Sequence, residues 1–138
     1  MSMDNKLRVE TGKFTDEEIY LILKKYPEKK EDLKIYQEAN YFQIHKLYFK
    51  NFFQGYVVLF LGYHSLKNYD VLIDDIGFLR DQDLLEPLMY KMLEKVKEHK
   101  VFSVPFEGIY YDVKFDAIYQ EMFHSLGFTE DDRELCRG

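Results

Sequence analysis

Carboxylates gather at one junction of the sequence, where an apolar segment runs into a long amphipathic one. Asp74 and Asp75 come late in the apolar segment, and the turn that follows reads RDQDLLE from Arg80 to Glu86. A turn from a strand into a helix often binds phosphate, because the first helical N–H groups are free and the helix dipole attracts anions. This junction is therefore the first place to look for a site that binds a phosphorylated ligand.

The acidic composition of this turn works against phosphate binding. The turn contains no glycine, and glycine is what lets a diphosphate approach the main chain closely. Asp83 followed by Glu86 matches a capping box, in which side chains satisfy the amides that a phosphate would use. Each anion near a helix N-terminus is worth roughly 0.3–1 kcal/mol, and Asp81, Asp83 and Glu86 would repel a bound diphosphate. Arg80 does not offset three acids, so we expect capping from within the protein. Pro87 fits the first turn if the helix begins nearer Glu86.

Other chemically active residue types show no spacing that indicates a site. The histidines are scattered without metal-ligand spacing, so we expect no metal site. The serines lack a nucleophile elbow or an obvious base, and Lys24-Lys25 and Lys29-Lys30 sit among acids, as on solvated helix faces. The single cysteine lies near the C-terminus, which excludes an intramolecular disulfide and fits a reducing cytoplasm. The histidines, serines and cysteine considered are His45, His64, His99, His124, Ser65, Ser103 and Cys136.

Composition limits the class of protein. The chain has 138 residues, a mass of 16.7 kDa and 46% hydrophobic residues, enough to bury one core without disulfides. A net charge of −6 disfavours non-specific nucleic-acid binding, because that binding needs clustered Lys and Arg. The longest apolar run, Tyr56 to Leu61, is far shorter than the roughly 20 residues of a membrane-spanning helix. We therefore expect one domain over residues 1–138, in the cytoplasm, without nucleic-acid or membrane partners.

Hydrophobic periodicity predicts an alternation of helices and strands. Thr15 and Glu18 form a capping box at the start of one helix, which Pro27 ends. Aromatic and β-branched residues then predict three antiparallel strands, broken at Gln54-Gly55 and after Tyr63. The expected ranges are a short strand at 7–9, a weaker helix at about 29–40, strands at 44–53, 56–63 and 69–78, a long helix from about Leu84, a strand at 101–106, a helix over 115–126 capped by Gly127, and a last strand near Phe128 or at 133–136.

The order of these elements and the segment AIYQEMFHSLGF near the C-terminus resemble the GNAT superfamily of N-acetyltransferases. The long helix should make strands 69–78 and 101–106 parallel through a right-handed crossover. The resemblance covers nearly the whole chain. It implies an α+β (mixed α/β) fold, with a central, mostly antiparallel twisted sheet of six to seven strands and about four helices on both faces. It also implies that the two parallel strands diverge beside Ile76 and open a cleft between Ile76 and Val104.

The resemblance assigns acetyl-CoA to the strand and turn around the acidic junction. The family's Arg/Gln-x-x-Gly-x-Gly/Ala motif grips the pyrophosphate of acetyl-CoA. Here Arg80 matches the first position of the motif, while Asp83 and Leu85 replace its glycines. Ile76 falls on the strand residue whose backbone bonds the acyl-CoA arm. The residues that the resemblance implies as a weak acetyl-CoA site are Ile76, Arg80, Asp81, Gln82, Asp83, Leu84 and Leu85.

Two residues could carry the chemistry that the resemblance implies. Asp75 lies where many members of the family keep a carboxylate that deprotonates the substrate amine through water. In the alternative, neither carboxylate has a chemical role: one of Asp74 and Asp75 faces solvent and the other only ends the strand. Phe123 occupies the place of the tyrosine that often protonates the leaving thiolate, and a phenyl ring cannot donate a proton. Tyr119, one helical turn earlier, could replace that tyrosine or be plain core. The acceptor would be a small-molecule or peptide amine.

Three functions from different classes remain open. The chain could be an acyl-CoA-dependent N-acetyltransferase with an altered loop, a catalytically inactive GNAT-fold binding or regulatory module with weakened CoA binding, or a domain that binds a different small molecule in the same cleft. The departures at Asp83, Leu85 and Phe123 favour the inactive module, whereas the resemblance favours the enzyme. The aromatic strands are expected to serve as core and as a homodimer surface.

Overall fold

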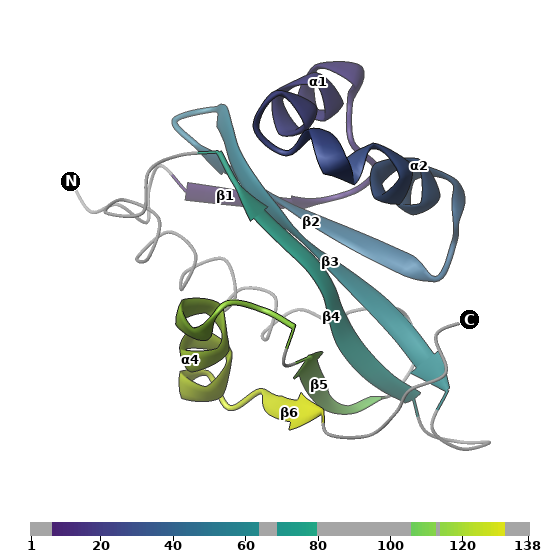
Figure 1. Ribbon diagram of the computed structural model, residues 1–138, viewed down its shortest axis with the longest axis vertical. Helices are drawn as coiled ribbons and strands as arrows, with labels where there is room; N and C mark the ends of the chain where they lie inside the picture. The colour runs from purple at the N-terminus through teal and green to yellow at the C-terminus, as the bar shows by residue number, and fades with distance from the viewer. Residues whose placement is uncertain (1–6, 64–68, 80–105, 113, 132–138) are drawn as a thin grey trace.

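The computed structural model describes residues 7–63, 69–79, 106–112 and 114–131 of the chain (Figure 1). The long helix predicted from about Leu84 lies outside these residues. No helix of the described part is long and apolar enough to cross a membrane. The described elements are, in chain order, β1 (Leu7–Thr11), α1 (Asp16–Lys25), the 3₁₀ helix η2 (Pro27–Lys29), α2 (Lys30–Glu38), β2 (Phe42–Phe49), β3 (Phe52–Tyr63), β4 (Tyr69–Phe78), β5 (Phe106–Asp112), α4 (Ala117–Ser125) and β6 (Thr129–Asp131).

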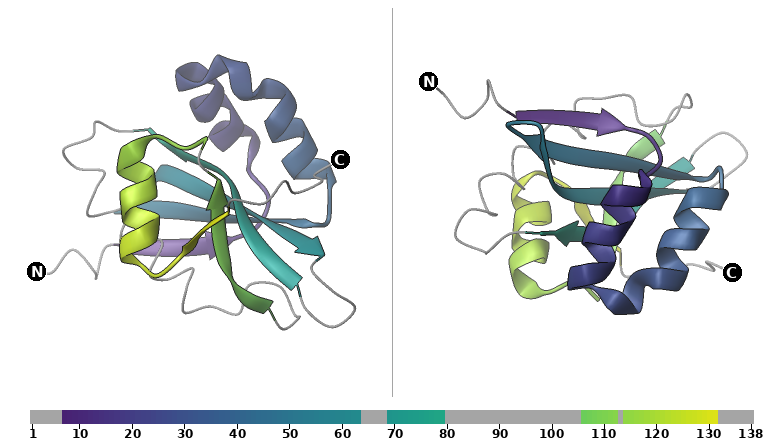
Figure 2. Two further views of the ribbon diagram at one scale, coloured as in Figure 1. Left: turned by 60° about the horizontal axis from the view of Figure 1, so that its bottom comes forward. Right: turned by 90° about the horizontal axis from the view of Figure 1, so that it is seen from above.

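The described strands form one mixed sheet whose spatial order follows the chain order. Strands β1 to β4 pair antiparallel, and β5 and β6 continue the sheet as parallel neighbours. Helices α1 and α2 cover one face of the sheet, and α4 covers the other (Figures 1 and 2). The predicted fold class, a mostly antiparallel mixed sheet with helices on both faces, is confirmed, and so is the parallel pairing of β4 with the strand that follows it.

Each face of the sheet carries its own hydrophobic core. Along β3, Tyr56 and Val58 face α1 and α2, whereas Val57 and Leu59 face α4, since successive strand side chains point to opposite faces. We call the first the α1–α2 core; its buried residues are Phe14, Ile22, Leu33, Tyr36, Ile44, Tyr56 and Val58. We call the second the α4 core; it includes Leu47, Val57, Leu59, Val71, Ile73, Ile76, Phe78, Ile109, Tyr111, Met122, Phe123, Leu126 and Phe128.

Helix α1 begins as the sequence predicts. Thr15 is the N-cap: its Oγ1 accepts a hydrogen bond from Glu18 N at 3.1 Å, and Glu18 Oε1 accepts one from Thr15 N at 2.8 Å. The buried carboxylate of Glu18 also accepts from Lys46 Nζ at 3.1 Å and from Tyr48 OH. Burial raises the pKa of Glu18, but the hydrogen bonds from Tyr48, Thr15 and Lys46 outweigh burial and leave the pKa lowered. One carboxylate thus caps α1 and ties it to β2.

The turn between β2 and β3 lies earlier than predicted. The sequence places a break at Gln54-Gly55, but the chain turns at Lys50 and Asn51, whose φ values of 53° and 68° suit a two-residue hairpin loop. At Gln54 the pairing register with β2 shifts instead, which marks a bulge. Gly55 follows this bulge, and a Cβ added there would lie 2.6 Å from Gly77 O. The glycine therefore marks a close approach between β3 and β4 and not a turn.

The described strand β5 extends further along the sequence than predicted. The expected range was 101–106, whereas the observed strand is Phe106–Asp112. Ile109 and Tyr111 alternate into the α4 core, which gives this segment its buried face; residues 101–105 lie outside the described part. The C-terminal elements follow the prediction more closely. Gly127 has a φ of 85° just after α4, as its predicted capping role requires, and β6 follows directly on Phe128.

Candidate functional site

A bulge in β4 turns two consecutive carboxylates toward the same face of the sheet. Ile73 and Ile76 both belong to the α4 core, although strict alternation would place residues three apart on opposite faces. The pairing with β3 shifts at the same point and leaves Asp74 as an extra residue. Asp74 and Asp75 consequently both contact groups on the α1–α2 face.

Beyond this bulge, β4 continues without a described pairing partner in β5. The last described pair between them joins Ile73 to Tyr111, but β4 runs on to Phe78 whereas β5 soon ends (Figure 1). In the described part, no residue of β5 pairs with Ile76, and the predicted divergence of two strands beside Ile76 stays a prediction. Val104, the predicted second wall of the cleft, lies outside the described residues, and in the observed register Tyr111 pairs with Ile73 near the end of β5.

Asp75 is the centre of a hydrogen-bond network that joins β4 to the α1–α2 face. Its Oδ1 accepts from Lys29 Nζ at 2.8 Å and from Ile76 N at 2.9 Å, and its Oδ2 accepts from Tyr56 OH at 2.9 Å. Lys29 Nζ also donates to Tyr56 OH at 3.0 Å. Both side chains of the Lys29–Asp75 ion pair are 15% exposed. Solvent therefore screens this pair much less than a pair on the open surface.

The neighbouring carboxylate is bound by a tyrosine of α2. Asp74 Oδ2 accepts from Tyr36 OH at 2.6 Å. Burial, followed by the charges of Asp75 and Asp74, raises the pKa of Tyr36 well above its ordinary value, and burial followed by Asp75 does the same for Tyr56. Both phenols therefore keep their protons and act as donors. The predicted alternative, in which one aspartate faces solvent and the other only ends the strand, is wrong.

Side chains of α1 and its C-terminal cap bind the backbone edge of β4 beyond the bulge. Leu79 N donates to a backbone oxygen of β3 at 2.9 Å, so Phe78 C=O in the same peptide unit points away from β3. This carbonyl accepts from Lys25 Nζ at 2.7 Å and from Tyr26 OH at 2.8 Å. The edge of β4 that faces away from β3 is thus held by residues from the α1–α2 face.

Lys29 is a residue of the candidate site that the sequence did not predict. The sequence places Lys25 and Lys29 on solvated helix faces, but both bind β4, and Lys29 Nζ also approaches Ile76 O at 3.4 Å. Its ammonium lies 4.7 Å from the centroid of the Tyr26 ring. Lys29 and Asp75 are 46 residues apart in the chain, and no local spacing signals a contact over that separation. The prediction of a solvated face is wrong for Lys29, whereas Lys25 is exposed as predicted although its Nζ bonds Phe78 O.

Tyr119 lies on the side of α4 that packs against the α4 core. Burial, followed by Tyr26, Asp116 and Asp75, raises the pKa of Tyr119 to about 12. The charge of Asp75 therefore influences this phenol, which keeps its proton at neutral pH. Phe123, one turn later, is fully buried in the α4 core. Of these two side chains, Tyr119 is the one with a hydroxyl group that could donate a proton.

The rest of the predicted acetyl-CoA site lies outside the described residues: Arg80, Asp81, Gln82, Asp83, Leu84 and Leu85. Ile76 is described, with its side chain in the α4 core and its N–H bonded to Asp75. The structure thus joins Ile76 and Asp75 by a hydrogen bond, while Tyr119 packs against the α4 core. Their roles in cofactor binding and catalysis stay predictions. Among the residues that can be described, no three His, Cys, Asp or Glu side chains gather as metal ligands.

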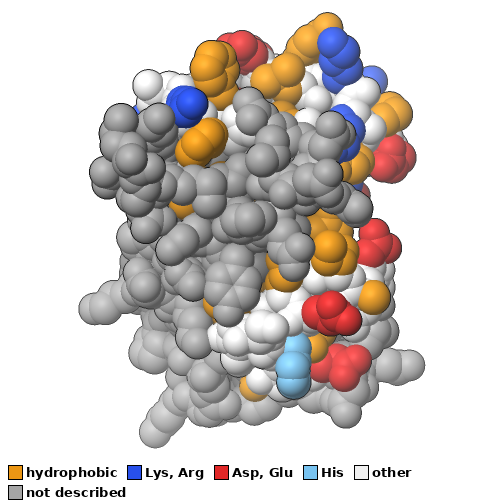
Figure 3. Space-filling view, turned by 90° about the vertical axis from the view of Figure 1, so that its left-hand side faces the viewer, with side chains coloured by type: hydrophobic (Ala, Val, Ile, Leu, Met, Phe, Trp, Pro, Cys, Tyr) orange, Lys and Arg blue, Asp and Glu red, His pale blue; other side chains and the backbone are white. Residues whose placement is uncertain are grey.

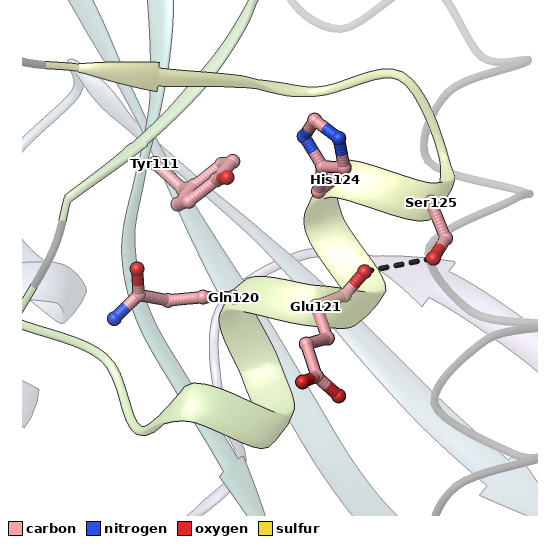
Figure 4. Close-up of a pocket in the computed structure, with 5 residues that line it drawn as sticks. All are labelled: Tyr111, Gln120, Glu121, His124 and Ser125. Atoms are coloured by element: carbon pink, nitrogen blue, oxygen red, sulfur yellow. Dashed lines mark hydrogen bonds between the residues drawn. The ribbon is translucent and has the colours of Figure 1, made fainter.

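A separate cavity of about 420 Å³ lies against α4 (Figure 4). Its lining residues are Tyr111, Gln120, Glu121, His124 and Ser125. Ser125 Oγ donates to Glu121 O at 2.8 Å, so its own helix satisfies this hydroxyl. In the space-filling view a histidine lies beside acidic side chains in the lower half, and the upper half shows both basic and acidic side chains (Figure 3). Asp75 and Tyr119 are not among the residues that line this cavity.

Comparisons with known proteins bear on the fold. No protein-family model matches the sequence, and no curated protein matches it. Solved structures match over nearly the whole chain. AAC(6')-Iy in complex with the bisubstrate analog CoA-S-monomethyl-acetylneamine is 15% identical, with a TM-score of 0.58 and coverage of 96% of this chain and 97% of that chain.

Two further structures show the same likeness. The aminoglycoside acetyltransferase meta-AAC0020 from an uncultured soil metagenomic sample, in complex with sisomicin, is 18% identical. Its TM-score is 0.61, and the match covers 97% of this chain and 95% of that chain. A possible acetyltransferase from Clostridium difficile 630 is 9% identical, with a TM-score of 0.62 and coverage of 96% of both chains. The chain therefore has the GNAT fold that the sequence resemblance predicted.

Proposed function

We propose that the chain is an acyl-CoA-dependent N-acetyltransferase, which transfers an acetyl group from acetyl-CoA to an amine. The observation that carries the proposal is the position of Asp75, a carboxylate at a bulge of β4 beside the point where the described pairing of β4 with β5 ends. The GNAT fold supports the proposal. So do the structural neighbours that were solved with CoA or with a CoA-containing analog.

The part of β4 beyond Ile73 suits an extended acyl-CoA arm. Beyond Ile73, the described β5 does not pair with the edge of β4, and an extended chain can add to such an edge. Part of this edge is already bonded, since Ile76 N–H donates to Asp75 and Phe78 O accepts from the α1 side. The hydrogen bond from Lys29 to Ile76 O is long, at 3.4 Å, and therefore weak. Ile76 would hold the arm, and the turn from Arg80 to Leu85 would hold the diphosphate with an affinity that its acids reduce.

The described side chains divide the proton transfers of the reaction between them. Acetyl-CoA, when bound, supplies an acyl group activated as a thioester. Asp75 takes a proton from the ammonium of the acceptor, which frees the lone pair of the nitrogen for attack. Tyr119, protonated because its pKa is about 12, donates toward the sulfur that leaves. Tyr36 and Tyr56 hold the carboxylates in place, and Asp74 adds a second negative charge that attracts a cationic amine. The acceptor class is a small-molecule or peptide amine.

A catalytically inactive GNAT-fold module with weakened CoA binding is the second candidate. The burial of Phe123 favours it, because this residue stands where the family keeps a tyrosine and contributes only packing here. The contacts of Lys25 and Tyr26 with Phe78 O favour it as well, since they occupy an acceptor that an arm could use. Both features would lower the rate and the affinity of the proposed enzyme.

Two measurements on the full chain test the proposal. Calorimetric titration with CoA measures binding, and release of free thiol from acetyl-CoA in the presence of a panel of amines measures transfer. We expect binding, and thiol release that depends on the added amine. Asp75→Asn should keep CoA binding and lower transfer by about 10²–10⁴-fold, the usual contribution of a general base. Tyr119→Phe should lower kcat while CoA binding stays unchanged.

A control separates the site from the rest of α4. Glu121→Gln changes the distinct α4 cavity and should leave binding and transfer unchanged. CoA binding without thiol release from any amine would favour the inactive module. If CoA and acetyl-CoA produce no heat at millimolar concentration, both candidate functions are wrong.

A further inference from the structure

Lys29 places an amine of the chain itself where the proposed reaction needs the amine of its acceptor. Its Nζ lies 2.8 Å from Oδ1 of Asp75, the proposed base, and 3.4 Å from Ile76 O on the strand proposed to hold the acyl arm. Lys29 is the last residue of η2, so its side chain reaches β4 from the α1–α2 face. We propose that Lys29 is an internal acceptor, which the chain acetylates when a thioester acyl donor lies along β4 beyond Ile73, where the described β5 does not pair with it. This inference rests on the proposed function.

The structure holds the Lys29 ammonium in one place. Besides Asp75, it contacts Tyr56 OH at 3.0 Å, and the rings of Tyr26 and Tyr56 lie 4.7 Å and 5.4 Å from it. Tyr26 is itself fixed, because its hydroxyl donates to Phe78 O at 2.8 Å. Well-oriented tethered groups react with effective molarities of about 10⁵–10⁸ M. A lysine held in this way has an advantage over free amines for the same acyl group.

The neighbouring lysines do not share this position. Lys25 Nζ bonds Phe78 O at 2.7 Å, two residues further along β4 than Ile76. Lys30, the next residue in the chain, is exposed at the start of α2. Lys29 is the lysine for which the structure gives an ion pair with Asp75 at 15% exposure. The acetylation should therefore be selective for Lys29, with Lys30 as the matched control.

The transfer balances with the groups at hand and a thioester as acyl donor. Asp75 takes one proton from the Lys29 ammonium, and the neutral Nζ forms a bond to the thioester carbonyl carbon. The nitrogen loses its second proton as the carbon–sulfur bond breaks, and the thiolate takes up one proton, for which Tyr119 is the candidate donor; the second proton from the nitrogen restores the donor. The products are an amide at Lys29, a free thiol and one proton released to solvent, and no oxidant or reductant is consumed.

Acetylation of Lys29 would change the site as well as mark it. An acetylated lysine keeps its length but loses its charge. Asp75 would then lose its ion-pair partner while it keeps the hydrogen bonds from Tyr56 and Ile76. A carboxylate without its cation attracts an external ammonium more strongly. The modification would thus convert the site from one that holds its own amine into one that accepts an added amine.

The test uses the full chain and two acyl donors. Purified protein is incubated with acetyl-CoA and, separately, with the acetyl thioester of N-acetylcysteamine, which lacks the nucleotide. Intact-mass measurement counts the acetyl groups, and peptide mapping locates them. We expect one acetyl group, on Lys29, added at least about 100-fold faster than to the same lysine in the urea-unfolded chain. Lys29→Arg should abolish this addition, Lys30→Arg should leave it unchanged, and Asp75→Asn should slow it by about 10²–10⁴-fold.

The other possible outcomes distinguish the internal acceptor Lys29 from the proposed CoA-dependent enzyme. If added amines release thiol while Lys29 stays unmodified, the internal acceptor is wrong and the proposed enzyme stands. If the nucleotide-free thioester acetylates Lys29 while CoA does not bind, the internal acceptor stands and CoA is not the donor. Acetylation spread evenly over exposed lysines, or none with either donor, overturns the internal acceptor. Mapping of the wild-type chain decides these points even if a variant fails to fold.

Discussion

The ion pair between Lys29 and Asp75 should contribute measurably to the stability of the fold. Lys29→Met removes the cation and keeps most of the side chain, and Asp75→Asn removes the negative charge and keeps its size. The two single variants and the double variant form a double-mutant cycle. We expect this cycle to give a coupling of about 2 kcal/mol in the free energy of unfolding.

The magnitude follows from the distance and the burial of the pair. At 2.8 Å and 15% exposure, two unit charges attract by about 6 kcal/mol at an effective dielectric constant near 20. Removing both groups from water cancels part of this attraction. Measured hydrogen bonds to charged groups contribute roughly 1.5–3 kcal/mol, and Tyr56 and Ile76 remain as partners of Asp75 when Lys29 is replaced. A coupling in the middle of that range is therefore expected.

Urea unfolding at neutral pH, followed by circular dichroism, measures the four free energies. The pair of Arg8 with Glu10 provides a matched control in the same chain, because its atoms are 3.3 Å apart but the side chains are 50% and 47% exposed. Its cycle should give at most about 0.5 kcal/mol, as exposed pairs usually do. A Lys29–Asp75 coupling no larger than that of the control would refute the reasoning, since burial would then not strengthen the pair.

Two further predictions concern the sheet and α1. Gly55→Ala should lower the free energy of unfolding by about 1–3 kcal/mol, because the new Cβ would lie 2.6 Å from both Gly77 O and Phe78 Cδ1; an unchanged urea midpoint would contradict this close approach. The pKa of Glu18 is lowered in the folded state from its ordinary value of 4.5. Ionised Glu18 therefore stabilises the fold fully at pH values above 4.5, and this stabilisation is lost as the pH falls through the folded pKa. Below about pH 4.5 the wild type should therefore lose stability more steeply than Glu18→Gln in urea titrations, and parallel pH profiles would argue against the network.

Features set by neighbouring residues could be predicted from the sequence. The capping box needs only Thr15 and Glu18 three residues apart, and both of its hydrogen bonds are present. Gly127 takes a positive φ after α4, as expected of a residue that ends a helix. The same glycine reasoning was wrong at Gly55, because a glycine within a strand can mark either a turn or a close approach of two backbones. Only the pairing partners of β3 distinguish these two roles.

The sequence of β4 contains a pattern that predicts its bulge, because the apolar positions change from odd to even numbers. Buried residues of the α4 core occupy odd positions at Val71 and Ile73 and even positions at Ile76 and Phe78. A strand that changes parity must contain an extra residue between the two pairs. This change places Asp74 and Asp75 on the same face of the sheet. The alternative in which one of them faces solvent does not take the change into account. The strand pairing confirms the shift at the same point.

The sequence by itself determined the order and type of most described elements, the capping of α1 and the resemblance to the GNAT fold, because periodicity and caps depend on residues a few positions apart. The tertiary structure decided which carboxylate has a cation beside it. Lys29 and Asp75 lie 46 residues apart and meet at 2.8 Å. Their contact depends on where η2 packs on the sheet and on the register that turns Asp75 toward it. These are relations between elements, and local sequence patterns do not encode them.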